Sequence, residues 1–164
     1  MNFARHQLPA HFTASGVVIH EGHILLVNHK RIGAWVPPGG HVEPTELPEE
    51  TVVREIMEET GIAVEIISDH MPETSSPDAF FLRRPLFMQA VVAVERGETF
   101  YHVDLSYLCR PVVSGSESGL PELSHNAETK EARWIKLSEI SSVPLAKNVI
   151  EILELLPSAT LSTT

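Results

Sequence analysis

The chain has 164 residues, of which 43% are hydrophobic and 21% charged, and its formal net charge is −10. This length suits one domain with its own core and is too short for two. No run of about 18 apolar residues occurs, which argues against a membrane span, and the hydrophobic content argues against wholesale disorder. The acidic excess disfavours a nucleic acid polymer as partner, because phosphate backbones require clustered Lys and Arg. A phosphorylated small molecule could bind only if a divalent cation or a local basic cluster offsets this charge.

The single cysteine, Cys109, rules out an internal disulfide and a multi-thiolate metal site. It falls in a strand-like apolar run, which predicts a buried structural thiol. The first residues lack the basic region and apolar stretch of a secretory signal. We therefore expect a cytoplasmic protein.

The first part of the chain predicts a β-hairpin followed by a loop. Two apolar runs, residues 13–20 and 23–29, flank Glu21-Gly22, the pattern of a tight turn. The segment Trp35-Val36-Pro37-Pro38-Gly39-Gly40 follows, and its two prolines and two glycines predict a sharply shaped loop without regular structure.

A helix is predicted after this loop. Pro48 suits a first helical position, Glu49 and Glu50 suit the positive end of the helix dipole, and Gly61 is a natural stop. Leu47, at the predicted N-cap, has no side-chain acceptor for the free helix N–H groups.

The second half of the chain predicts further strands and one helix. A short strand at 62–69 is followed by an irregular loop at 70–85. The nearly unbroken apolar run 86–94 predicts a strand covered on both faces, and a turn leads into a strand at 100–109. A loop at 114–130 precedes a final short strand at 132–135.

The last predicted element is a helix at residues 143–156, whose buried stripe would comprise Val149, Ile150, Leu153 and Leu156. Strands interspersed with two helices predict an α/β (α+β) fold in which a sheet packs against helices. The expected organisation is an N-terminal arm (1–12), one domain (13–157) and a frayed tail (158–164).

The helix at 48–60 carries three acids on one side. At about 100° per residue, with Glu55 at zero, Glu58 lies near −60° and Glu59 near +40°. The opposite side carries Val53, Ile56, Met57 and Thr60. Two unit charges about 4 Å apart repel by on the order of 4 kcal/mol at an effective dielectric of 20. A hard divalent cation, Mg²⁺ or Mn²⁺, would relieve this repulsion, since the nearby ligands are all oxygens.

The spacing of these acids is specific. Gly40, Glu46 and the run Arg54-Glu55-Ile56-Met57-Glu58-Glu59-Thr60-Gly61-Ile62 resemble, position for position, the signature of the Nudix hydrolase family. At residue frequencies of about 7%, seven fixed identities would meet by chance in such a chain roughly once in a million. The resemblance implies an α/β/α sandwich with a mixed sheet between helices.

The resemblance also implies a reaction and the residues that perform it. The reaction is Mg²⁺-dependent hydrolysis, by water attack on phosphorus, of a small nucleoside diphosphate derivative. Glu55, Glu58 and Glu59 would bind metal, and one of them could accept a proton from the attacking water. Arg54 and Glu46 would orient these carboxylates, and a carbonyl of Gly39 or Gly40 could complete the coordination. Oligomeric state is not set by the signature, and a homodimer is one expectation for it.

Further candidates lie outside the signature. Family members often use another acid from a distant loop, and Glu128 and Glu131 are the positioned candidates, with solvated loop acids as the alternative. His41 could touch phosphate or a leaving group, or could pack in the turn. Arg83 and Arg84 are clustered cations that could bind phosphate, although exposed loop arginines are commoner.

A polar row is predicted on the strand at 100–109. His102, Asp104 and Ser106 point to one side, and the alternate apolar residues point to the other. The row could line a substrate cavity, where Asp104 would accept hydrogen bonds from a base or sugar, or could face solvent.

Two other functions compete with the hydrolase. A binding or regulatory module could keep the fold without turnover, but such relatives usually lose signature acids, and all are present here. Isomerase chemistry on an isoprenoid diphosphate would need a reactive cysteine near the site, and Cys109 is predicted to lie in a core strand.

Overall fold

A computed structural model describes residues 8–68, 71–113, 119–127 and 129–156. The chain opens with the predicted hairpin, strands β1 (Ala10–His20) and β2 (His23–His29). Both turn residues have positive φ, 44° at Glu21 and 71° at Gly22, as a tight two-residue hairpin turn requires. The hairpin prediction is confirmed.

The remaining elements follow in chain order: β3 (Trp35–Val36), β4 (Gly39–His41), α1 (Pro48–Thr60), β5 (Val64–Ile66), β6 (Phe87–Glu95), β7 (Glu98–Pro111), β8 (Thr129–Lys136), the 3-10 helix η1 (Leu137–Ser142) and α2 (Lys147–Glu154). The segment predicted to be an irregular loop thus contains parts of two short strands, β3 and β4. Hydrogen bonds to neighbouring strands order this glycine-containing backbone.

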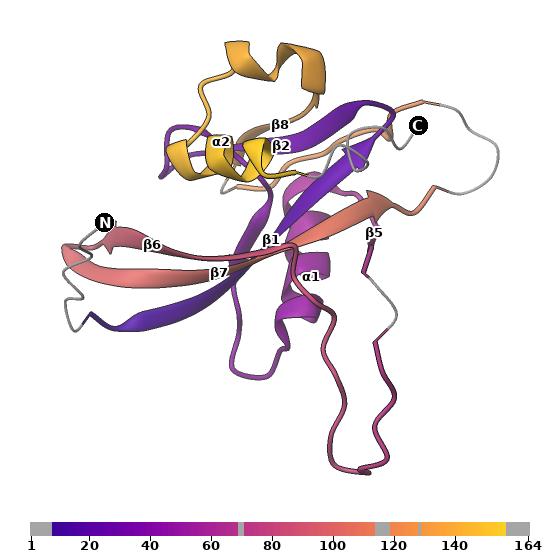
Figure 1. Cartoon of the computed structure of the whole chain (residues 1–164). Helices are drawn as coiled ribbons and strands as arrows, with labels where there is room; N and C mark the ends of the chain where they lie inside the picture. Colours follow the sequence, from indigo (N-terminus) through magenta and orange to yellow (C-terminus); the bar gives the residue numbers. More distant parts are fainter. Residues whose placement is uncertain (1–7, 69–70, 114–118, 128, 157–164) are drawn as a thin grey trace.

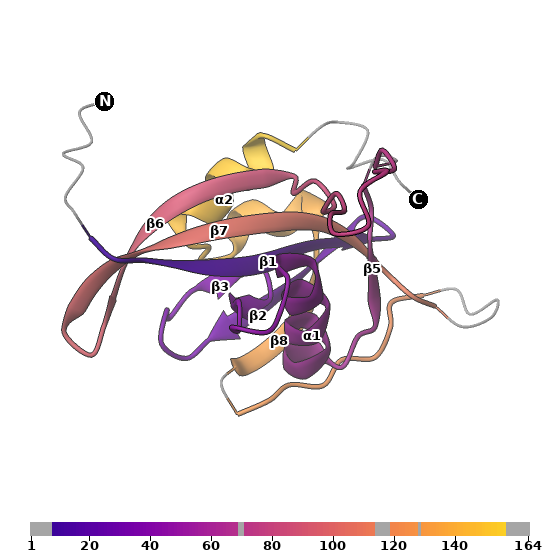
Figure 2. The same cartoon turned by 90° about the horizontal axis from the view of Figure 1, so that it is seen from below.

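Strand β1 joins the two halves of a mixed sheet. It pairs in parallel with β7, from Ala10↔Tyr101 to Val18↔Cys109, and antiparallel with β4 and β2. Strands β5 and β6 pair with β7, and β3 and β8 pair with β2. Helices α1 and α2 lie on opposite sides of the sheet (Figures 1 and 2). The predicted α+β sandwich with a mixed sheet is confirmed.

Helix α1 begins and ends as predicted. Pro48 is its first residue, and Leu47 at the N-cap makes no side-chain bond. The Glu50 carboxylate instead accepts a hydrogen bond from the Leu47 N–H at 2.8 Å. Gly61 closes the helix with φ 74°, and its N–H donates to the Met57 carbonyl. A positive φ here suits glycine, which has no Cβ to strain.

The buried side of α1 packs on β1 at Gly16. Val52 and Ile56 are fully buried and belong to the core cluster that also holds Ala14 and Val18. A Cβ at Gly16 would overlap the end of the Ile56 side chain, so the absence of a side chain sets how closely the helix approaches the strand.

Two parts of the expected helix packing are wrong. Val53 and Met57, on the apolar side of α1, were expected to be buried but are 36% and 44% exposed, and both line a groove between α1 and β5. In the last helix, Ile150 is exposed, whereas Ile152 is buried with Val149 and Leu156. That helix begins at Lys147 rather than 143, and its buried residues recur at spacings of three and four, which places Ile150 on another side.

The expectation that the strand at 86–94 is covered on both faces is also wrong for the single chain. Along β6, exposed residues alternate with half-buried ones, and Met88, Val92 and Val94 are each more than half exposed. An unbroken apolar sequence shows that both faces are apolar, but not that a second layer covers each.

Among the described residues, no helix is long and apolar enough to cross a membrane.

The contact at Gly16 gives a stability prediction. Gly16→Ala should lower the free energy of unfolding by about 1–3 kcal/mol, because the added methyl overpacks the core against Ile56. The double variant Gly16→Ala/Ile56→Val removes the overlapping methyl group, so its loss should be smaller than the sum of the two single losses. Urea denaturation of all four proteins measures this coupling, and strictly additive losses would contradict the contact.

Candidate active site

The glycine strand β4 places its backbone against the acidic side of α1. A Cβ at Gly40 would overlap the Glu55 carboxylate, so a residue with a side chain could not keep this approach. The Gly39 N–H donates to Glu59 Oε2 at 2.9 Å. Two of the three signature acids therefore contact β4, a segment about twenty residues earlier in the chain.

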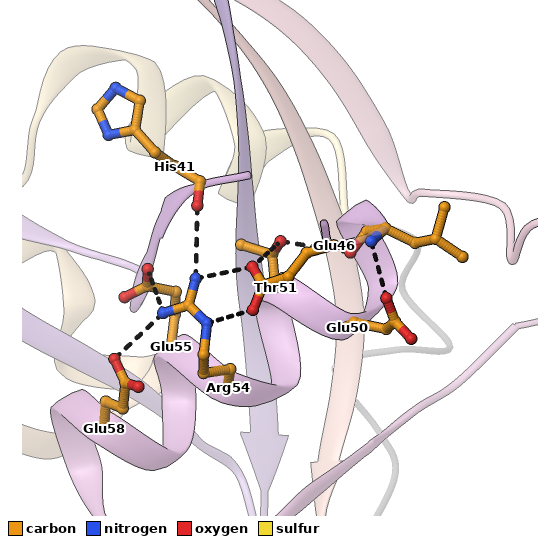
Figure 3. Close-up of polar contacts among 8 residues, drawn as sticks. His41, Glu46, Glu50, Thr51, Arg54, Glu55 and Glu58 are labelled. Atoms are coloured by element: carbon orange, nitrogen blue, oxygen red, sulfur yellow. Dashed lines mark hydrogen bonds and ion pairs between the residues drawn. The ribbon is translucent and has the colours of Figure 1, made fainter. Parts of the chain in front are cut away.

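The guanidinium of Arg54 lies at the centre of the acid cluster (Figure 3). Its Nε and one terminal nitrogen donate to the two carboxylate oxygens of Glu46, at 2.6 and 2.9 Å. The other terminal nitrogen donates to Glu55 at 2.9 Å and to Glu58 at 3.1 Å. This planar group can hold several carboxylates at once because it presents five N–H donors in a fixed geometry.

Glu46 is held from two sides. Besides the fork from Arg54, its Oε2 accepts a hydrogen bond at 2.9 Å from the hydroxyl of Thr51, which is fully buried. The bond to Arg54, and to a lesser degree the Thr51 hydroxyl, lower the pKa of Glu46 to about 2, against the opposing effect of burial. The hydrogen bond to Glu46, and then the bond to Glu55, raise the pKa of Arg54. Both groups therefore stay charged at neutral pH.

The acids present carboxylate oxygens, the kind of ligand that a hard divalent cation prefers. Glu59 is only 3% exposed, and a carboxylate buried this far needs compensating positive charge or hydrogen bonds. Glu55 is largely shielded and Glu58 is half exposed, so one side of the cluster stays open to solvent. Within the described ranges, no three acid, histidine or cysteine side chains already stand close enough to enclose a metal ion. Glu55 and Glu58 turn toward Arg54 instead.

Asp104 belongs to a hydroxyl network between β1 and β7. Its Oδ1 accepts from Thr13 at 2.9 Å, and its Oδ2 accepts from Ser15 at 2.8 Å and from Ser106 at 2.7 Å. The parallel register brings these residues together, since Thr13 lies opposite Asp104 and Ser15 opposite Ser106. With three donors already in place, the network ties the two strands together.

Three histidines gather beside this network. The His41 ring lies edge-on to His102 at 4.8 Å between centroids and 5.9 Å from His11, which stacks near Phe100. His102 Nε2 is buried without a hydrogen-bond partner. Burial, and then the neighbouring His41, lower the pKa of His102. The His41 ring points away from the carboxylates, while its carbonyl faces Arg54 (Figure 3).

The remaining predicted residues lie farther from the acids or cannot be placed. Arg83 donates a hydrogen bond to the Ile66 carbonyl and lines a groove of about 670 Å³ between α1 and β5. None of the three metal-binding candidates, Glu55, Glu58 and Glu59, lines this groove. Arg84 is exposed in the same loop. Glu131 lies on β8 and pairs with Arg133. Glu128 lies outside the described residues.

The sequence reasoning missed Thr51, His11 and the hydroxyls around Asp104. Thr51 could have been found, because it lies one helical turn before Arg54 and so shares its side of α1. The other residues become neighbours only through the β1–β7 and β1–β4 pairings, for which the sequence carries no local signal.

Cys109 does not fit a reactive role. It is fully buried in the core beneath α1, and burial raises the pKa of its thiol to about 12. A thiol of this kind is almost entirely protonated at neutral pH and is a poor nucleophile. The isomerase alternative therefore lacks its cysteine.

Comparison with known proteins gives the family to which this fold and this arrangement of glycines and acids belong. The sequence profile of the NUDIX domain matches residues 10–157. The chain belongs to this family.

Individual relatives agree with this assignment. A MutT-like protein of Streptomyces ambofaciens is 46% identical over 55 residues, which are 33% of this chain and 36% of that protein. The match thus spans about a third of that relative. An RNA pyrophosphohydrolase of Erythrobacter litoralis is 26% identical over 126 residues, covering 75% of this chain and 73% of the relative. A NUDIX family hydrolase from Clostridium perfringens has the same fold, with a TM-score of 0.67 and 23% identity over 92% of this chain and 95% of that one.

The low pKa of Glu46 predicts a pH-dependent contribution to stability. Because the pKa falls from 4.5 to about 2 on folding, the ionised carboxylate stabilises the folded state above pH 4.5, and this contribution is lost as the pH falls toward 2. The difference in unfolding free energy between wild type and Glu46→Gln should therefore shrink across this window. Urea denaturation at several pH values measures it.

Glu65→Gln is the matched control, because Glu65 also pairs with an arginine, Arg110, but at the exposed surface. Such surface pairs contribute little. The stability lost in Glu46→Gln could be independent of pH, or no larger than the loss in Glu65→Gln. Either result would show that Arg54 does not stabilise the charged form of Glu46.

Proposed function

We propose that this chain is a divalent-metal-dependent hydrolase that cleaves a diphosphate linkage in a small nucleoside diphosphate derivative. The observation that carries the proposal is the contact between β4 and α1. Gly40 leaves room for the Glu55 carboxylate, and the Gly39 N–H holds Glu59, so two of the acids meet the β4 backbone at one place. This oxygen-only donor set suits Mg²⁺, with Mn²⁺ as substitute.

Glu55, Glu58 and Glu59 would hold the metal, with a carbonyl of Gly39 or Gly40. When bound, the ion would neutralise the charge on the substrate phosphates and orient the attacking water. Arg54 and Glu46 act indirectly, since the guanidinium fixes the carboxylates and Glu46 fixes the guanidinium. One of the three metal-binding acids would also accept the proton that the water loses.

The substrate is proposed to extend from the acids over the neighbouring strands. His41 directly follows Gly40 and contacts the ring of His102. The unpartnered Nε2 of His102 offers a hydrogen bond to a base or sugar, whereas Asp104 acts mainly by tying β1 to β7. Arg83, Arg84, Glu128 and Glu131 stay candidates for phosphate binding and for an additional acid.

The relatives suggest which substrates to test. One bears the name RNA pyrophosphohydrolase, but the net charge of −10 disfavours a long nucleic acid on this chain. The panel therefore includes nucleoside triphosphates, sugar nucleotides, dinucleoside polyphosphates, coenzymes and an RNA with a 5′-triphosphate, each with Mg²⁺. We further propose the cytoplasm as its compartment, since the single cysteine allows no internal disulfide.

The proposed function predicts a loss of activity when the metal-binding acids are neutralised. Glu59→Gln and Glu58→Gln should each lower the metal-dependent kcat by orders of magnitude on the best substrate of the panel, because each removes a charge that would bind the ion. Released phosphate or pyrophosphate is measured. Glu139→Gln, at an exposed acid on η1, is the control and should keep the wild-type rate.

Two outcomes would count against this assignment. If purified Glu59→Gln turned its substrate over at the wild-type rate, Glu59 would have no part in the reaction. If wild type bound nucleotides but turned none of the panel over, the chain would be a binding or regulatory module.

The proposed function also predicts a loss of metal affinity when Gly40 gains a side chain. Gly40→Ala should weaken Mn²⁺ binding and lower turnover at limiting metal, because the new methyl group displaces the Glu55 carboxylate. Calorimetric titration with Mn²⁺ measures the affinity directly. Gly33→Asn is the control, since Gly33 has open space around it and asparagine tolerates its φ of 69°. Unchanged Mn²⁺ affinity in Gly40→Ala would contradict the proposed role of Glu55.

A further inference from the structure

The outer end of the sheet carries an apolar face that no described part of the chain covers. Along β6, alternate residues Met88, Ala90, Val92 and Val94 point to this face. The β-sheet register extends it across β7 and β1, since Ala90 lies opposite Val103, and Val103 lies opposite Phe12. We call these six residues the open sheet face. Figures 1 and 2 show this end of β1, β6 and β7 reaching beyond both helices.

The exposed fractions on this face are large for apolar side chains. They are 56% at Phe12, 65% at Met88, 59% at Val92 and 68% at Val94. Isolated exposed apolar residues are normal, but a contiguous group on neighbouring strands marks an interaction surface.

The open sheet face continues the surface that α1 covers. Farther along the same side of β1 and β7, Ala14 and Tyr107 are buried in the core cluster with α1 residues Val52 and Ile56. The strands extend beyond the helix. The side chains on this side of the strands are therefore buried beneath α1 and exposed beyond it.

The apolar area of this face approaches the area that one partner buries in a stable dimer. At these exposed fractions the four large side chains present on the order of 500 Å² of apolar surface. A stable interface buries about 800 Å² per partner. The partly buried Val103, Tyr101 and Leu105 and the exposed Ala90 add to this area.

The chemistry of the face favours a second copy over other partners. None of its six residues is charged, so pairing the face with itself across a two-fold axis sets no like charges opposite each other. A membrane surface is disfavoured, because β6 carries no Lys or Arg and the chain is strongly acidic.

Strand β6 also lacks the protection usual for an edge strand. Among the described elements it pairs only with β7, and its sequence contains no lysine, proline or glycine. Natural edge strands of this length normally carry such residues, because they prevent uncontrolled association. A defined partner would serve the same purpose.

We propose that two copies of this chain pack their open sheet faces together, forming a homodimer in which β6 is covered on both faces. Two sheets packed in this way lie about 10 Å apart, as in a β-sandwich. The arrangement would also satisfy the pattern of the β6 sequence, which is apolar at nearly every position. It is independent of the proposed hydrolase reaction.

The test is the mass of the full-length chain in solution by sedimentation equilibrium. Wild type should show twice 18.1 kDa at micromolar concentration. Because each copy has a net charge of −10, association should strengthen with added salt. Val92→Glu, which puts a charge at the middle of the interface, should raise the dissociation constant by roughly 100-fold.

Val112→Glu is the matched control, since Val112 is 54% exposed but lies outside the open sheet face. It should remain dimeric. Val94→Glu changes the most exposed position of the face and should also dissociate the dimer. Its circular dichroism spectrum should match that of the wild type. The test therefore remains valid even if Val92→Glu fails to fold.

An independent measurement uses cross-linking. Because Cys109 is buried, Ala90→Cys introduces the reactive thiol, and a short bis-maleimide should link two copies through it. Three outcomes would each overturn the proposal. The wild type could be monomeric, Val112→Glu could break the dimer while Val92→Glu leaves it intact, or the chain could bind anionic vesicles without associating with itself.

Discussion

One cation makes the acidic side of α1 compatible with folding. Glu46, Glu55 and Glu58 would repel one another in a chain that already carries a net charge of −10. Arg54 donates hydrogen bonds to all three, and its planar fork lets it do so at the same time. Arg54 donates two of these bonds to Glu46 and one each to Glu55 and Glu58. The firmer hold on Glu46 suits its proposed role of fixing the guanidinium rather than binding the metal.

The glycines of β4 supply the second half of this site. Glu55 and Glu59 reach the β4 backbone only because Gly40 has no side chain and Gly39 has a free N–H to donate. Strand β4 is itself held by antiparallel pairing with β1, which also packs against α1 at Gly16. The same strand thus positions the helix and the glycines, and the distance between carboxylate and backbone follows from core packing rather than from a flexible loop.

The outer part of the sheet has two chemically different faces. On β7, His102 and Asp104 point to the polar face beside β4, and the alternate residue Val103 points to the open sheet face. The two-residue period of a strand allows this division within one element.

The signature spacing was sufficient to predict the family, the acids of α1 and the helix limits at Pro48 and Gly61, because these features are local and repeat with the helical period. The hairpin at Glu21-Gly22 was predictable for the same reason. The roles of Thr13, Ser15 and His11 were not, since these residues meet Asp104 and His102 only through strand pairings between residues about 90 apart. The apolar run of β6 likewise determined that both faces of the strand avoid water, but not what covers them. Burial depends on which elements lie above a strand, and that is decided by the three-dimensional packing of the whole chain.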